Sequence, residues 1–123
     1  MAMAKTVLMA DDSATMRKLV ELTLKSAGFE VIVAVNGKDA LTKLNNAKID
    51  MVITDLNMPE MDGIALIKQL RGSPVNKFTP IVMLTTESQI DEREEGRKAG
   101  ASGWVFKPFT PDKLLETVKK LVK

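Results

Sequence analysis

Five short apolar segments alternate along the chain with stretches in which apolar residues recur at helical spacing. Segments of this kind, rich in Val, Ile, Leu and Met, are typical of strands that are buried on both faces of a sheet. Strands that alternate with helices through short connections form a parallel sheet covered by helices on both faces. We therefore expect an α/β fold with strands at Thr6–Ala10, Phe29–Val35, Ile49–Thr54, Pro80–Leu84 and Ser102–Phe106.

A helical stretch follows each strand, and local signals mark its ends. Gly28 and Gly72 are expected to end the first and third helices, and Asn36-Gly37 to form a turn before the second. Thr110 is expected to cap the fifth helix, with Pro111 at its first position. The apolar positions of these four helices run from Met16 to Ala27, Ala40 to Ala47, Ile64 to Leu70 and Leu114 to Val122.

The fourth helix is expected to differ from the others. Ser88, followed by Asp91, is a variant of the capping box and predicts where this helix opens. Only Ile90 and Ala99 are apolar in the stretch that follows, and Gly96 costs roughly 1 kcal/mol relative to Ala in a helix interior. We therefore expect this helix to pack weakly and to be the mobile element of the fold.

The composition limits the chemistry that the chain can perform. With 45% hydrophobic and 28% charged residues, we expect one domain over residues 1–123, with an N-terminal tail at residues 1–4 and no output domain. The chain has no cysteine and no histidine, which excludes disulfides, thiol and imidazole catalysis, and histidine-ligated metals. Carboxylates, hydroxyls and lysines must therefore carry the chemistry.

Charge and hydropathy argue against two classes of partner. The 18 basic and 16 acidic residues give a net charge of +2, and aromatic residues make up only 4%, so nucleic-acid binding is not supported. The sequence shows neither a secretory signal nor an apolar stretch long enough to span a membrane. We expect a cytoplasmic monomer.

Five polar residues lie at or just beyond the ends of four expected strands. In a parallel sheet these ends meet at one edge, and the crevice outside that edge is where ligands bind in open α/β folds. Taken singly, each residue has an ordinary structural explanation, as a helix cap, a turn, a strand end or a solvated cation. Their convergence on one edge favours a site composed of Asp11, Asp12, Asp55, Thr85 and Lys107.

Three carboxylates in one crevice repel each other unless a proton or a hard cation is bound. Mg²⁺ fits a few carboxylates, a carbonyl and waters better than Ca²⁺, which would need more oxygen ligands. A lysine and a hydroxyl opposite such a site can neutralise a transferring phosphoryl group, and a carboxylate can itself be the nucleophile. Asp55 is therefore interpreted as a phosphoryl acceptor.

Four motifs together resemble the receiver domain of two-component response regulators, and most closely its single-domain, CheY-like chemotaxis members. The resemblance covers essentially the whole chain. It implies a flavodoxin-like, doubly wound, five-stranded parallel sheet with five helices and the strand order 2-1-3-4-5 that is characteristic of this fold. The motifs are Asp11-Asp12, the Asp55 to Gly63 stretch, Thr85, and the Gly100 to Phe109 stretch.

The resemblance implies a role for each residue of the site. Asp55 would accept a phosphoryl group from a histidine of a sensor kinase. Asp12 and Asp55 would bind Mg²⁺ directly, Asp11 would bind it through water, and the backbone carbonyl of Asn57 would complete the protein ligands. Asn57 would also tune dephosphorylation together with Glu87.

The remaining implied roles concern the switch. Lys107 would pair with the phosphoryl oxygens, the Thr85 hydroxyl would move to bond one of them, and the Lys107-Pro108 peptide would be cis. Trp104 stands where the family has a switch aromatic, often Tyr, that turns inward with the Thr. The output surface would be the fourth helix, fifth strand and fifth helix, with partner contacts at Ile90, Arg93, Trp104 and Lys119.

The resemblance also implies the partners: a CheA-like sensor histidine kinase, a FliM-like flagellar motor switch protein and a phosphatase. The chain would be a signalling switch that catalyses only its own phosphorylation and dephosphorylation. A phosphorelay intermediate or phosphate-sink receiver of another pathway is the alternative. A haloacid-dehalogenase-type phosphatase is disfavoured because Asn57 stands where its second Asp would be, and an FMN-binding flavodoxin because Asp11-Asp12 replaces its phosphate loop.

Overall fold

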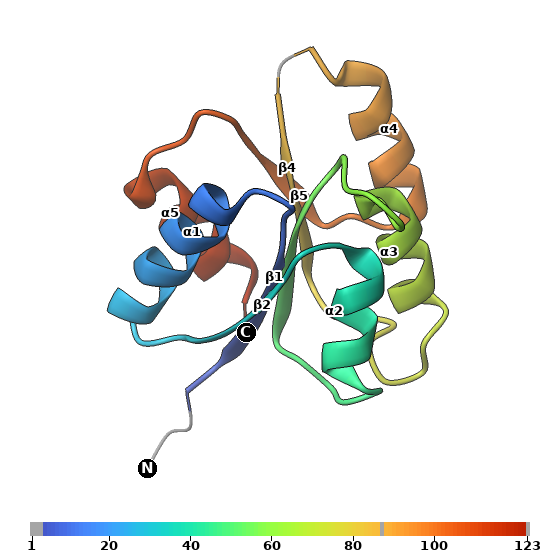
Figure 1. Cartoon of the computed structure of the whole chain (residues 1–123), viewed down its shortest axis with the longest axis horizontal. Coiled ribbons are helices and arrows are strands. Elements are labelled where there is room, and N and C mark those ends of the chain that lie inside the picture. Colours follow the sequence, from blue (N-terminus) through green and yellow to red (C-terminus); the bar gives the residue numbers. More distant parts are fainter. Residues whose placement is uncertain (1–3, 87, 123) are drawn as a thin grey trace.

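The computed structural model describes residues 4–86 and 88–122, which form a three-layer α/β structure (Figure 1). The five strands, all parallel, lie in the order β2-β1-β3-β4-β5, which confirms the predicted fold. The strands are β1 (Thr6–Ala10), β2 (Glu30–Ala34), β3 (Met51–Asp55), β4 (Ile81–Thr85) and β5 (Gly103–Phe106). The helices are α1 (Ala14–Ser26), α2 (Gly37–Leu44), α3 (Gly63–Arg71), α4 (Ile90–Ala99) and α5 (Pro111–Leu121).

Helices α1 and α5 cover one face of the sheet, and α2, α3 and α4 cover the other (Figure 1). Every residue of the central strands β3 and β4 is buried, so their side chains alternate between two cores. Met51, Ile53 and Val82 belong to the core beneath α1 and α5, and Val52 and Met83 to the core beneath the other three helices. Continuous apolar strands are therefore explained by burial on both faces.

Two predicted helix starts are wrong in detail. Asn36-Gly37 does not form a separate turn before α2. Asn36 is the N-cap of this helix, and its Oδ1 accepts the Asp39 N–H at 2.8 Å. Ser88 does not cap α4. The N-cap is Gln89, which makes no side-chain cap bond because its Oε1 accepts the Thr86 N–H at 2.7 Å. By contrast, Thr110 caps α5 as predicted, accepting the Lys113 N–H.

Gly96 packs closely against β4, a role that helix propensity does not indicate. It is buried, and a Cβ built on it would lie 2.1 Å from Met83 Sδ, closer than any real contact. The absence of a side chain thus allows α4 to lie directly on β4. That α4 is the mobile element stays a prediction.

Within the part of the chain that the structure describes, no helix is both long and apolar enough to cross a membrane.

Candidate functional site

The carboxyl ends of β1, β3, β4 and β5 bring the five predicted site residues to one edge of the sheet. Asp11 and Thr85 are fully buried, and Asp55 is 9% exposed, whereas Asp12 faces solvent. One carboxylate oxygen from each of Asp11, Asp12 and Asp55 can be chosen so that all three lie within 4.8 Å of one another. The sequence prediction that these acids converge is therefore correct in geometry.

Lys107 supplies the positive charge at the centre of this cluster. Its Nζ donates to Asp55 Oδ1 at 2.8 Å and lies 3.7 Å from Asp11 Oδ2. Its backbone N–H donates to the Thr85 carbonyl at 2.6 Å, and the Lys107-Pro108 peptide is cis, as the resemblance implied. Lys107 thus joins the end of β5 to both β3 and β4.

Two polar atoms at the site are buried without a hydrogen-bond partner among the described residues: Asp11 Oδ2 and Thr85 Oγ1. The other oxygen of Asp11 accepts the Ser13 N–H at 2.9 Å. Buried polar atoms normally have partners, and an unpartnered one calls for an explanation such as a ligand or ion. Both atoms belong to the predicted site residues, and the Lys107 ammonium lies 3.7 Å from Asp11 Oδ2, so a bound cation or polar group would satisfy both.

The buried carboxylate of Asp11 is also electrostatically unfavourable. Burial raises the pKa of Asp11 above its ordinary value, and the nearby Asp55 raises it further, against the opposing Ser13 hydrogen bond and Lys107. Burial disfavours the charged form because the carboxylate loses its hydration. A bound cation would offset this penalty, which is the fit expected of a hard-metal site.

Replacing Asp11 by Asn is expected to stabilise the metal-free protein at pH 7. A carboxyl group whose pKa is higher in the folded state binds its proton more tightly there, so stability falls as pH rises through that raised pKa. The penalty vanishes below the unfolded pKa of 3.8. Urea unfolding in EDTA should show Asp11→Asn more stable than wild type at pH 7, with a difference that shrinks on acidification. A less stable variant at pH 7 would contradict this account.

The loop after β3 forms the outer wall of the site. Asn57, Met58, Pro59 and Asp62, together with Asp12, line an open depression above the carboxylates. The loop folds tightly because Gly63 donates its N–H to the Leu56 carbonyl, and a Cβ on Gly63 would lie 2.3 Å from the Asp55 carbonyl oxygen. Only glycine therefore allows α3 to start so close to the end of β3.

The donor set suits Mg²⁺. The three carboxylates offer only oxygen atoms, which hard cations prefer, and the depression leaves room for waters. Too few oxygens converge for the seven or eight ligands that Ca²⁺ often takes. Asp11, Asp12 and Asp55 are therefore the residues that would hold the ion, and the carbonyl of Asn57 is the further ligand that the family resemblance implies.

Arg17 is a site residue that the sequence interpretation missed. Its Nη1 donates to the Asp11 carbonyl at 2.8 Å, so α1 holds the peptide that leads into Asp12. The sequence could not reveal this contact, because the acceptor is a backbone carbonyl and hydrophobic periodicity does not identify such acceptors.

The residues predicted for switching and output lie around β5. Trp104 packs against the core beneath α2, α3 and α4, and with Ile90 and Arg93 it lines a hollow beside α4. Lys119 is exposed on α5. A groove between β5 and α5 is lined instead by its neighbour Lys120, with Lys113 and Glu116. Glu87 lies outside the described residues.

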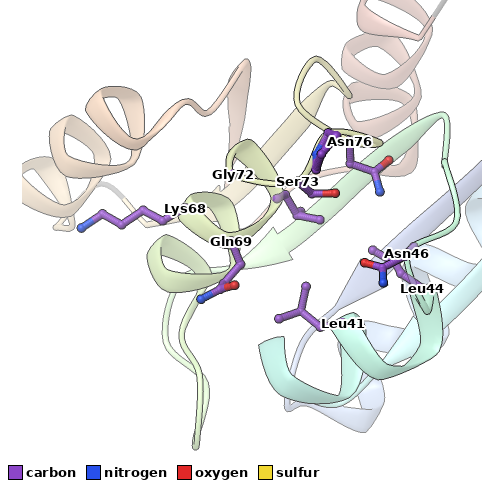
Figure 2. Close-up of a pocket in the computed structure, with 10 residues that line it drawn as sticks. Leu41, Leu44, Asn46, Lys68, Gln69, Gly72, Ser73 and Asn76 are labelled. Carbon is purple, nitrogen blue, oxygen red and sulfur yellow. The ribbon is translucent and has the colours of Figure 1, made fainter.

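A second hollow, of about 470 Å³, lies between α2 and α3, away from the acidic edge (Figure 2). Leu41 and Leu44 face residues of α3 across it, and the one charged side chain that lines it, Lys68, points away (Figure 2). Asn76 at its edge is bonded to the backbone of Ala47 and Ile49. Among the described residues that line this hollow, none is acidic and none has a buried polar side-chain atom without a partner.

Comparison with known proteins identifies the class. Residues 7–119 match the model of the response regulator receiver domain, and the chain belongs to this family. Its relatives include chemotaxis protein CheY1 of Helicobacter pylori, 43% identical over 92% of this chain and 93% of the relative. Chemotaxis protein CheY of Pseudomonas aeruginosa is 37% identical over 94% of each chain.

Solved structures of response regulators are also similar to this chain. The chemotaxis response regulator CheY4 of Vibrio cholerae has a TM-score of 0.92 and 43% identity, covering 98% of this chain and 100% of that one. A response regulator of Chloroflexus aurantiacus has a TM-score of 0.91 and 37% identity, covering 97% and 98%. The protein is thus a receiver-domain response regulator that is similar to CheY chemotaxis proteins.

Proposed function

We propose that Asp55 accepts a phosphoryl group from a histidine of a sensor kinase and that the modified protein binds a downstream partner. The observation that carries this proposal is the pairing of Asp55 with Lys107 beside two unpartnered buried atoms, Asp11 Oδ2 and Thr85 Oγ1. The first marks a place for a cation, and the second marks a place for an acceptor such as a phosphoryl oxygen.

The geometry supports a part for each oxygen of Asp55. Oδ1 accepts both the Leu56 N–H and the Lys107 ammonium, at 2.9 and 2.8 Å, which fixes the carboxylate in place. The other oxygen would attack phosphorus, forming the new O–P bond while the P–N bond to the kinase histidine breaks and the imidazole leaves. Lys107, already at the site, would then pair with the phosphoryl oxygens.

Mg²⁺ bound by Asp11, Asp12, Asp55 and the Asn57 carbonyl would neutralise charge on the transferring group. Thr85 is buried at the end of β4 with a free hydroxyl, so a small movement would let it donate to a phosphoryl oxygen. Asn57, exposed above the site, would influence the approach of water to the acyl phosphate, and we retain Glu87 in the same role.

Intact-mass spectrometry after incubation with acetyl phosphate tests the chemistry. Wild-type protein should gain one phosphoryl group when Mg²⁺ is present and gain none when EDTA replaces it. Asp55→Asn is the matched control, since it keeps the shape of the side chain and removes the nucleophile. An equal adduct on wild type and control would refute the assignment.

We further propose that phosphorylation changes the surface of α4, β5 and α5 so that it binds the flagellar motor switch. The naming of the bacterial relatives as chemotaxis proteins supports this, as does the position of Trp104 between the core and α4. The contacts would include Ile90, Arg93, Trp104 and Lys119. On this proposal the protein acts in the cytoplasm as a monomer.

A pull-down separates this proposal from its alternative, a phosphorelay intermediate or phosphate sink. The protein is incubated with lysate of its source organism in Mg²⁺ alone and in Mg²⁺ with beryllofluoride, a phosphoryl mimic. Flagellar switch components enriched only in the second sample would support the motor assignment. Recovery of a kinase or phosphotransfer protein without any partner specific to the activated state would favour the relay.

A further inference from the structure

A cationic side chain of α4 lies over an aromatic ring of β5. The guanidinium carbon of Arg93 is 4.8 Å from the centroid of the Phe106 ring, within the range of a cation–π interaction. Arg93 Nε is buried and has no hydrogen-bond partner in the described part of the chain. The guanidinium is therefore held against the ring and not by an acceptor at Nε.

Phe106 is coupled directly to the proposed switch residue. It is the partner of Thr85 in the ladder between β4 and β5, and the next residue, Lys107, donates its N–H to the Thr85 carbonyl. Phe106 and Trp104 are two residues apart on β5, so their side chains share a face of the strand. A displacement at Thr85 would thus act on Phe106 through its immediate neighbours.

The first turn of α4 is exposed. Its N-cap makes no side-chain bond, and Ile90 in the first turn is 61% exposed. The close packing of Gly96 on Met83 holds the C-terminal half of the helix. Arg93 lies between these two regions, where α4 contacts the Phe106 ring of β5.

We propose that Arg93 and Phe106 form a latch that holds the N-terminal half of α4 on β5 in the resting protein, and that activation at Asp55 opens it. Phe106 is already 40% exposed, and opening would free the rest of its ring, the face that the guanidinium covers. The trigger rests on the proposed function, whereas the latch itself is a property of the unphosphorylated chain and can be tested alone.

Hydrogen exchange of the α4 amides in EDTA tests the resting latch. Phe106→Leu removes the ring but keeps an apolar side chain, and Arg93→Gln removes the cation. Each should speed exchange in the first turns of α4 about two- to fivefold, the effect of a cation–π contact of this kind. Phe106→Tyr, which keeps the aromatic face, and Lys98→Gln, an exposed charge on the same helix, should exchange like wild type.

A second measurement follows activation by fluorescence. Trp104 is the only tryptophan and there is no tyrosine, so its emission reports the change around α4 during titration with beryllofluoride and Mg²⁺. Phe106→Leu should respond at about two- to fivefold lower beryllofluoride than wild type. Unchanged α4 exchange in Phe106→Leu and Arg93→Gln would overturn the latch. Faster exchange in both, with no beryllofluoride response in any protein, would support the resting latch and overturn the proposed switch.

Discussion

Lys107→Met is expected to slow phosphoryl transfer from acetyl phosphate by about 10²-fold, the usual cost of removing one preorganised group that stabilises developing charge. The same variant should bind Mg²⁺ more tightly, by about tenfold, because Asp55 and Asp11 lose the cation at 2.8 and 3.7 Å. The two effects have opposite signs, which a general loss of folding could not produce.

Stopped-flow Trp104 fluorescence can follow the transfer, and calorimetry can follow Mg²⁺ binding. Lys113→Met is the matched control: Lys113 is an exposed lysine on α5, and its ion pair with Glu116 is solvent-exposed. The control should match wild type in both assays. Weaker Mg²⁺ binding in Lys107→Met, or transfer at the wild-type rate, would show that Lys107 does not serve the acceptor site.

Arg71→Ala is expected to lower the free energy of unfolding by about 3 kcal/mol, because one guanidinium satisfies backbone carbonyls from separate segments of the chain. Its nitrogens donate to the Gly100 carbonyl at 3.0 and 2.8 Å and to the Thr79 carbonyl at 2.7 Å, with further bonds to the carbonyls of Lys77 and Asn76. It thereby ties the end of α3 to the loop before β4 and to the turn between α4 and β5.

Urea denaturation with Arg71→Ala, Arg71→Lys and Lys68→Ala tests this role. Arg71→Lys should recover little of the lost stability, because a single ammonium cannot reach carbonyls on both sides as the planar guanidinium does. Lys68, an exposed residue on the same helix, should contribute less than about 0.5 kcal/mol. A loss under about 1 kcal/mol in Arg71→Ala would mean that water replaces these bonds at little cost.

The sheet and the acidic edge follow from local patterns in the sequence. Apolar runs identify the buried strands, and each run ends within one or two residues of a polar side chain such as Asp11, Asp55 or Thr85. Parallel pairing then places these ends together without any knowledge of distant contacts. The order of the strands could be predicted only from the family resemblance, because hydrophobic periodicity does not say which strands are neighbours.

Features that depend on tertiary contacts were missed or misjudged. In the sequence Gly96 resembles a helix defect, and only the structure shows that Met83 packs against it. The role of Arg71 depends on carbonyls that only folding brings together. Arg93 has the sequence context of a surface charge, and its contact with the Phe106 ring is seen only in the structure. Ser88 fits a local capping pattern, yet the helix starts later because the Gln89 side chain bonds to Thr86 instead.

Borohydride trapping tests the central claim, that Asp55 carries the phosphoryl group, at the level of the single residue. Borohydride reduces an acyl phosphate on an aspartate to the alcohol, so peptide mapping after treatment with acetyl phosphate and Mg²⁺ identifies the modified position. Homoserine is expected at position 55, dependent on Mg²⁺, with Asp11, Asp12 and Asp62 unmodified. Homoserine at any of those other positions, or none anywhere in a protein that has gained phosphoryl mass, would contradict it.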